Sequence, residues 1–448
     1  MNLKFPKNFI LGAATAAYQI EGGRHEDGKG DSNWDKFCDI PGNIDRNETG
    51  EVACDHYHRF KEDVAKMKEM HLDGYRFSVA WTRIIPDGDG EVNQKGIDFY
   101  NSLIDELIAA GIEPMLTMFH WDLPQALADR GGWLNPDSVK WYTRYAEVLF
   151  DAFGGKVKKF ITFNEPFVFT DFGYVTGSFP PGIKGDYRAK LLAAHHVLMS
   201  HGSAVKLYRT KNLGGEIGIT FDYAYNCPAT KSKEDIEAAK LANEFWAGWY
   251  FEPVACGDYP KHAKKWFGER GLLPEITKED MKLITEPVDF IGINHYFVNY
   301  VAADKSNTRE GTRHVYPSVH HSDMDWPITE DGFYELLKYL QSVLKVPLYI
   351  TENGISLNDI VTLDGTIEDY DRIDYMKRYL GKLSQAIAEG LDCRGYYYWS
   401  LMDNMEWAAG YKPRFGLIHV DYATQKRTIK RSGEWYRSLI DQKNGQNK

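Results

Sequence analysis

The chain has 448 residues, a length that fits either two or three small domains or one large barrel of alternating strands and helices. Its 53 basic and 64 acidic residues give a formal net charge of −11, which argues against nucleic acid or an anionic membrane as a partner. Aromatic residues make up 14% of the chain, a composition that suits either a large core or a site that stacks flat apolar faces.

The five cysteines are odd in number and lack paired spacing, so they predict reduced thiols, most of them buried. No apolar run approaches the roughly 20 residues that a membrane helix needs. The N-terminus carries no signal-peptide pattern. We therefore expect a cytoplasmic protein with neither a membrane nor a nucleic-acid partner. The oligomeric state stays open, and a homo-oligomer is compatible with the sequence.

Eight short apolar runs recur along the chain, and each is typical of a buried strand. They cover residues 10–14, 74–81, 113–120, 159–164, 216–221, 288–294, 347–351 and 395–400. Helical periodicity predicts helices between them, over residues 58–70, 94–110, 136–153, 188–210, 233–250, 332–343 and 372–389. Asn135 is the expected N-cap of the third of these helices.

Strands that alternate with helices predict parallel βαβ units, and eight units predict an α/β fold of the closed (β/α)8 TIM barrel type. We expect a single domain over residues 1–448 with elaborated loops after the strands. An open doubly wound sheet is the competing fold. It is disfavoured because no glycine-rich phosphate loop follows any of the runs.

Polar residues stand at or near the ends of most of these runs. The carboxyl ends of barrel strands meet at one mouth, where barrel enzymes have their active sites. The residues concerned are Gln19, Arg76, His120, Asn164, Glu165, Asn294, Tyr296, Glu352 and Trp399. Their convergence predicts one functional site at the mouth of the barrel.

Two runs end alike, in a glutamate followed by residues that stop the strand: Glu165 before Pro166, and Glu352 before Asn353 and Gly354. A buried carboxylate is costly without partners or a task. Bracing of the barrel is the structural alternative to catalysis. In a catalytic pair, about 5–5.5 Å between the carboxyl groups leads through a covalent glycosyl-enzyme, and about 6.5–9.5 Å admits a water and inverts configuration. The residues alone leave both open.

The motifs around these positions resemble the family 1 glycoside hydrolases, the β-glucosidase family. The resemblance runs from about residue 5 to about residue 440. It rests on residues 9–22, 75–81, 120–124, 162–166, 293–296, 350–354 and 399–407. It implies a (β/α)8 barrel, a retaining double displacement without a cofactor, and a small β-glucoside or oligosaccharide as substrate.

The resemblance also implies residue roles. Glu352 would be the nucleophile and Glu165 the acid/base. Arg76, Asn294 and Tyr296 would support Glu352, and Asn164 would hold the sugar 2-hydroxyl. Recognition of the sugar would fall to Gln19, His120, Trp121, Glu406 and Trp407, with Trp399 beneath the ring. The implied activity is release of terminal β-D-glucosyl residues from cellobiose-like oligosaccharides and aryl glucosides, as in cellulose degradation.

Two alternatives remain: a 6-phospho-β-glycosidase, and a catalytically inactive sugar-binding barrel. An anionic Glu406 would repel a phosphate, and family members that act on phosphorylated sugars carry Ser there. The presence of both Glu165 and Glu352 opposes an inactive barrel. Glucose, galactose and fucose are not distinguished as the glycone, and the aglycone is equally open.

No metal is expected. His195, His196 and His201 lie on a predicted helix without an HExxH pattern or a carboxylate-rich cluster. We interpret them as packed or solvated histidines.

Overall fold

A closed barrel of eight parallel strands forms the centre of the computed structural model, which describes residues 3–307 and 309–445. The strands are β1 (Ile10–Ala14), β2 (Gly74–Ser78), β3 (Glu113–Phe119), β4 (Lys159–Asn164), β5 (Glu216–Asp222), β7 (Phe290–Asn294), β10 (Leu348–Asn353) and β11 (Cys393–Trp399). They neighbour one another in chain order, and β11 closes the ring by pairing with β1. The predicted (β/α)8 barrel is confirmed, and each predicted run supplies one strand.

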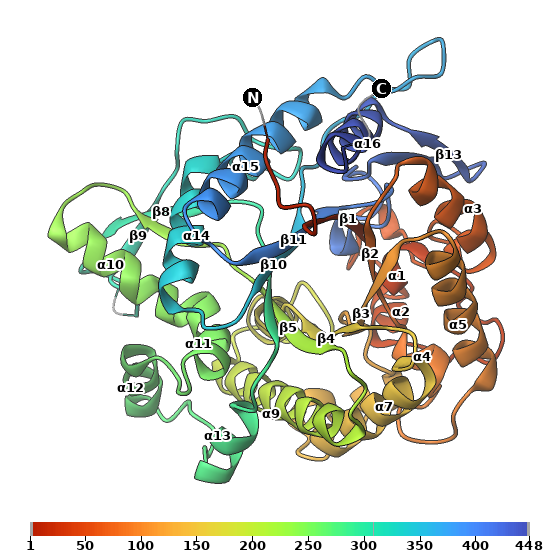
Figure 1. Ribbon diagram of the computed structural model, residues 1–448. Helices are drawn as coiled ribbons and strands as arrows, with labels where there is room; N and C mark the ends of the chain where they lie inside the picture. Colours follow the sequence, from red (N-terminus) through yellow and green to blue (C-terminus); the bar gives the residue numbers. More distant parts are fainter. Residues whose placement is uncertain (1–2, 308, 446–448) are drawn as a thin grey trace.

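Helices surround this ring of strands (Figure 1). The longer ones are α3 (His56–Glu69), α5 (Gln94–Ala109), α7 (Ser138–Phe153), α9 (Tyr187–Lys211), α10 (Lys233–Asn243), α14 (Glu330–Val343), α15 (Tyr370–Ala388) and α16 (Arg431–Lys443). Among the described residues, no helix has both the length and the apolar character to cross a bilayer.

Burial explains why the strands are continuous apolar runs and the helices are amphipathic. A strand covered by helices on one face and by barrel side chains on the other has no solvent face, and β1, β2, β7 and β10 are buried throughout. A surrounding helix buries one stripe only. In α3 the stripe includes Val64 and Met67, whereas Phe60 is half-buried.

The loops carry further small elements. They include the strands β6 (Asn226–Pro228), β8 (Asn299–Ala303) and β9 (Thr312–Val315) of one sheet and β12 (Ile418–Asp421) and β13 (Lys426–Ile429) of another. The short helices are α1 (Ala17–Ile20), α2 (Asn33–Cys38), α4 (Trp81–Ile84), α6 (Gln125–Ala128), α8 (Pro166–Asp171), α11 (Trp249–Ala255), α12 (Lys261–Glu269) and α13 (Lys278–Ile284).

Three local predictions are wrong. The second strand ends at Ser78, because the chain turns into α4 at Trp81, whose indole donates to the Gly88 carbonyl at 3.0 Å. The predicted helix over 233–250 breaks after Asn243 into a π-helical turn, where Trp246 has non-helical backbone angles. Asn135 does not cap α7, since its Oδ1 accepts from the Asp137 backbone N–H and the helix begins at Ser138.

The five cysteines match the prediction. None of them forms a disulfide among the described residues, four are buried, and Cys256 is exposed.

Candidate active site

A cavity of about 420 Å³ opens at the carboxyl ends of the barrel strands. Nine of the twelve predicted site residues line it: His120, Trp121, Glu165, Asn294, Tyr296, Glu352, Trp399, Glu406 and Trp407. The other three, Gln19, Arg76 and Asn164, are buried behind this lining. Arg76 and Asn164 contact it through hydrogen bonds to Glu352 and His120, and Gln19 donates to the carbonyl of Met405, the residue before Glu406. The structure therefore brings the whole predicted set together.

Glu352 lies near the end of β10 and is 3% exposed. Arg76 donates to its Oε1 at 2.6 Å, and the Tyr296 hydroxyl donates to its Oε2 at 2.6 Å. Burial raises the pKa of this carboxyl, while the Arg76 charge and the Tyr296 hydrogen bond oppose that shift. Both oxygens are thus held by donors that favour the ionised form.

Glu165 follows β4 directly and is 6% exposed. Its backbone is left-handed, with φ 49° and ψ 65°, and its N–H donates to the Thr220 carbonyl at 2.9 Å. Pro166 excludes the right-handed helical conformation for the residue before it, so α8 begins one residue past the glutamate. The Asn294 amide donates to Glu165 Oε1 at 2.7 Å. Burial, followed by the charge of Glu352, raises the pKa of Glu165 well above its ordinary value.

A hydrogen-bonded chain joins the two carboxyl groups. Asn294 donates to Glu165 and also to Asn164 Oδ1, at 3.0 Å. The same Asn164 oxygen accepts from Arg76 at 2.6 Å, and Arg76 donates to Glu352. Among the described residues, the side-chain hydrogen bond to Glu165 comes from a neutral amide, whereas a guanidinium donates to Glu352. This asymmetry assigns the proton of the pair to Glu165.

Asn164 also determines the tautomer of His120. Because its Oδ1 accepts two hydrogen bonds, its Nδ2 is the donor that contacts His120 Nε2 at 3.0 Å. The Nε2 atom is therefore an acceptor and the proton lies on Nδ1. Burial, helped by the Arg76 charge, lowers the pKa of His120 well below its ordinary value, so the ring is neutral.

Three polar atoms of the predicted sugar-binding residues are buried and have no hydrogen-bond partner among the described residues: Gln19 Oε1, His120 Nδ1 and Glu406 Oε2. Leaving a buried polar atom unpaired costs about 1–3 kcal/mol. Gln19 Oε1 is an acceptor, His120 Nδ1 is a donor, and the Glu406 carboxyl can accept or, when protonated, donate, so these atoms are available to a ligand that carries several hydroxyl groups. Burial raises the pKa of Glu406 to about 8, and the charge of Glu352 adds to this shift.

Aromatic rings surround the same end of the cavity. Trp121 and Trp407 lie with centroids 4.5 Å apart, and the His120 ring stacks beside Trp399 at 6.0 Å. The indole of Trp121 donates to the Asn164 carbonyl at 2.9 Å, which holds the ring in place. One part of the cavity is formed by His120, Trp121, Trp399 and Trp407 together with Glu165 and Glu352. We call this part the inner half of the pocket. All six of these residues are buried.

Comparison with known proteins agrees with this geometry. The profile of "Glycosyl hydrolase family 1" matches residues 1–445. The chain belongs to glycosyl hydrolase family 1. Members of this family are hydrolases that retain the anomeric configuration.

Individual members of family 1 are similar over nearly the whole chain. "Beta-glucosidase A" of Acetivibrio thermocellus is 45% identical over 441 residues, 98% of each chain. "1,4-beta-D-glucan glucohydrolase" of Thermotoga neapolitana is 42% identical over 439 residues, again 98% of each chain. The solved "Beta-glucosidase from Thermotoga maritima in complex with glucoimidazole" superposes with a TM-score of 0.95 at 43% identity and covers 99% of this chain and 100% of that one.

Five further residues line the cavity: Phe172, Asp222, Trp246, Phe297 and Trp326. We call them the outer half of the pocket, and the sequence of this family 1 chain did not predict them. These residues line the cavity and are half-buried, which places them at its opening. Asp222 could have been found, because it is the last residue of β5 and polar strand ends mark the site. The four aromatic residues lie in loops or short helical turns and carry no such signal.

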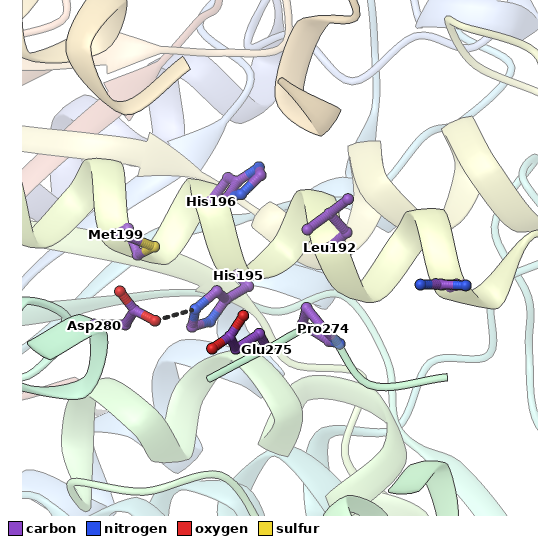
Figure 2. Close-up of a pocket in the computed structure, with 8 residues that line it drawn as sticks. Leu192, His195, His196, Met199, Pro274, Glu275 and Asp280 are labelled. Atoms are coloured by element: carbon purple, nitrogen blue, oxygen red, sulfur yellow. Dashed lines mark hydrogen bonds and ion pairs between the residues drawn. The ribbon is translucent and has the colours of Figure 1, made fainter. Parts of the chain in front are cut away.

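The family 1 chain has a second cavity, of about 310 Å³, between α9 and the segment before α13. Figure 2 shows the His195 ring turned toward Asp280 there. His195 also contacts the Tyr259 hydroxyl at 2.9 Å, and His196 Nδ1 donates to the Trp133 carbonyl at 2.8 Å. No group of three or more His, Cys, Asp or Glu side chains in the described part of the chain has metal-binding geometry. These histidines pack within the structure.

Proposed function

We propose that this family 1 hydrolase is a β-glucosidase that releases terminal β-D-glucosyl residues from cellobiose-like oligosaccharides and aryl glucosides. The observation that carries the proposal is the asymmetric carboxyl pair: Glu352 accepts hydrogen bonds from Arg76 and Tyr296, while Glu165 accepts one from the neutral Asn294 amide and, within the described residues, from no charged side chain. Relatives named β-glucosidase, one of them bound to glucoimidazole, support glucose as the glycone.

In the first step, Glu352 attacks the anomeric carbon as the bond to the leaving oxygen breaks, and Glu165 transfers its proton to that oxygen. The product is a covalent glycosyl ester on Glu352. Esterification removes the negative charge that raises the pKa of Glu165. Glu165, now ionised, accepts a proton from water, whose oxygen attacks the anomeric carbon and expels Glu352. Two displacements restore the β configuration.

Asn164 is the proposed contact of the sugar 2-hydroxyl. Its Nδ2 carries two protons, and His120 Nε2 accepts one of them. The second proton is available to a ligand, and a contact to the 2-hydroxyl strengthens in the transition state. His120 Nδ1, Gln19 Oε1 and Glu406 Oε2 would pair with the remaining hydroxyl groups.

A free rather than a phosphorylated glycone is supported by the charge of the whole lining. With a pKa of about 8, Glu406 is mostly neutral at neutral pH, so this residue by itself is not enough to repel a phosphate. The described lining, however, holds the four carboxyl groups of Glu165, Asp222, Glu352 and Glu406 and no Lys or Arg. A phosphate dianion would find no cation there to offset its desolvation. A cytoplasmic location and the state of assembly stay predictions.

The test is hydrolysis of 4-nitrophenyl β-D-glucoside beside its 6-phosphate, with the first-formed sugar followed by proton NMR. We expect turnover of the free glucoside, with β-glucose appearing before mutarotation. Preference for the phosphorylated substrate would establish a 6-phospho-β-glycosidase instead. Absence of turnover together with tight glucose binding would establish an inactive sugar-binding barrel, and α-glucose as the first product would exclude the double displacement.

A further inference from the structure

The outer half of the pocket combines aromatic side chains with one carboxylate. Phe172, Trp246, Phe297 and Trp326 are half-buried around the opening. Their positions are held by ring contacts and hydrogen bonds. Trp246 packs 5.4 Å from Phe167 and donates from its indole to Glu310 at 3.1 Å, and Phe297 packs 5.6 Å from Trp326. Aromatic faces attract cations, most strongly where water is excluded.

Asp222 supplies the carboxylate. It is the last residue of β5 and pairs in register with Asn294, whose amide contacts Glu165. Asp222 therefore lies near Glu165, the proposed proton donor, whose pKa its charge also raises. Within the described residues, no hydrogen bond joins its carboxylate to another side chain.

Lys190, a cation whose charge acts on Asp222, is paired with another carboxylate. Lys190 of α9 is buried, donates to Asp171 at 2.6 Å and lies 4.8 Å from the Phe167 ring centroid. The Asp171 charge raises the pKa of Asp222 and the Lys190 charge lowers it, and Lys190 is already hydrogen-bonded to Asp171. In the described part of the chain, no ion pair joins Asp222 to a Lys or Arg side chain.

We propose that the outer half of the pocket selects leaving groups that carry a positive charge, so that β-glucosides with an ammonium-bearing aglycone are better substrates than neutral aglycones of the same shape. The proposal rests on the proposed β-glucosidase activity and names its substrate class. The ammonium group would lie between the aromatic rings and the Asp222 carboxylate, while the glucosyl unit occupies the inner half.

The preference has a pH dependence. The titratable and charged groups that face Asp222 are Glu165, Glu352, Asp171 and Lys190. Burial, together with the Asp171 and Glu352 charges, raises the pKa of Asp222 to about 7. Below that value Asp222 is mostly protonated and above it mostly ionised, so the preference for a cation grows as pH rises from about 6 to about 8.

The experiment compares kcat/KM for 4-[(trimethylammonio)methyl]phenyl β-D-glucoside and its neutral isostere, 4-neopentylphenyl β-D-glucoside. We expect the wild-type protein to favour the cation about tenfold at pH 8. Asp222→Asn keeps the shape of the side chain and removes its charge. The ratio of the two kcat/KM values should then fall most of the way to the ratio expected from the different intrinsic reactivity of the two phenol leaving groups. Asp151→Asn removes an exposed charge on α7 and should leave the ratio unchanged, which separates a local from a general charge effect.

A second measurement needs no variant at Asp222. Choline and its neutral isostere 3,3-dimethylbutan-1-ol are compared as competitive inhibitors of 4-nitrophenyl β-D-glucoside hydrolysis by the wild-type protein. Choline should inhibit at a concentration several-fold lower. Equal inhibition by the two compounds, or equal substrate ratios in the wild type and Asp222→Asn, would overturn the cation preference. Turnover of the neutral aryl glucoside would in that case leave the β-glucosidase proposal standing. Failure to hydrolyse either aryl glucoside would instead overturn the β-glucosidase proposal.

Discussion

The inner and outer halves of the pocket are built in different ways. The inner half comes mostly from residues at or just after the ends of barrel strands, which are buried and joined by hydrogen bonds from Glu165 through Asn294, Asn164 and Arg76 to Glu352. The outer half comes mostly from loops, and its aromatic residues are half-buried. The difference indicates that the two carboxyl groups are held by the rigid barrel, and we expect the loops to govern which leaving groups are accepted.

The largest expected effect lies in the inner half. Glu352→Ala should lower kcat for aryl glucosides by several orders of magnitude, since no nucleophile remains. Azide should restore turnover by entering the space of the carboxylate, and the product should be the α-glycosyl azide. Product configuration is read by NMR. Near-normal hydrolysis by this variant would show that another residue is the nucleophile.

The second largest loss of activity is expected from Glu165→Ala, and its size should depend on the leaving group of the substrate. Loss of general acid catalysis costs about 10²–10⁴-fold where the leaving oxygen needs a proton, so alkyl glucosides should suffer far more than 2,4-dinitrophenyl glucoside. The alkaline limb of kcat/KM should also disappear, because in the wild type activity is lost as pH rises through the raised pKa of Glu165. Equal losses for all leaving groups would contradict an acid role.

A smaller effect is expected from Tyr296→Phe, which removes one of the two donors to Glu352. Without that hydrogen bond, burial raises the pKa of Glu352 further, and the acid limb of the pH profile should move to higher pH. We expect a loss of about tenfold in kcat near neutral pH. Tyr316→Phe, a change at an 88% exposed tyrosine, is the control and should leave the profile in place. An unmoved acid limb would mean that Tyr296 does not act on the nucleophile.

The smallest effect should come from the outer half. Trp326→Ala removes an aromatic wall of the opening and should raise KM for aryl glucosides by about three- to tenfold, with kcat nearly unchanged. For methyl β-D-glucoside, which has no aromatic leaving group, KM should stay the same. A large fall in kcat for both substrates would show that the two halves are not separable.

The same division explains what could be predicted from the sequence. Apolar runs that end in polar residues pointed to the strand ends, so the barrel and the positions of Glu165, Glu352 and Asn294 were readable. The π-helical turn near Trp246 and the positions of Phe297 and Trp326 depend on contacts between loops far apart in the chain, such as the bond from Trp246 to Glu310. Asn135 was misread because a short polar side chain can bond to the backbone of a turn as readily as it caps a helix.

The left-handed backbone of Glu165 ahead of Pro166 has one more consequence. The direction of the proposed proton donor is set by the backbone restriction that proline imposes, by one main-chain bond to the neighbouring strand and by the Asn294 amide, rather than by the aromatic surfaces of the opening. New aglycone specificities can therefore be engineered or can evolve by exchanging those surfaces, without realigning the acid each time.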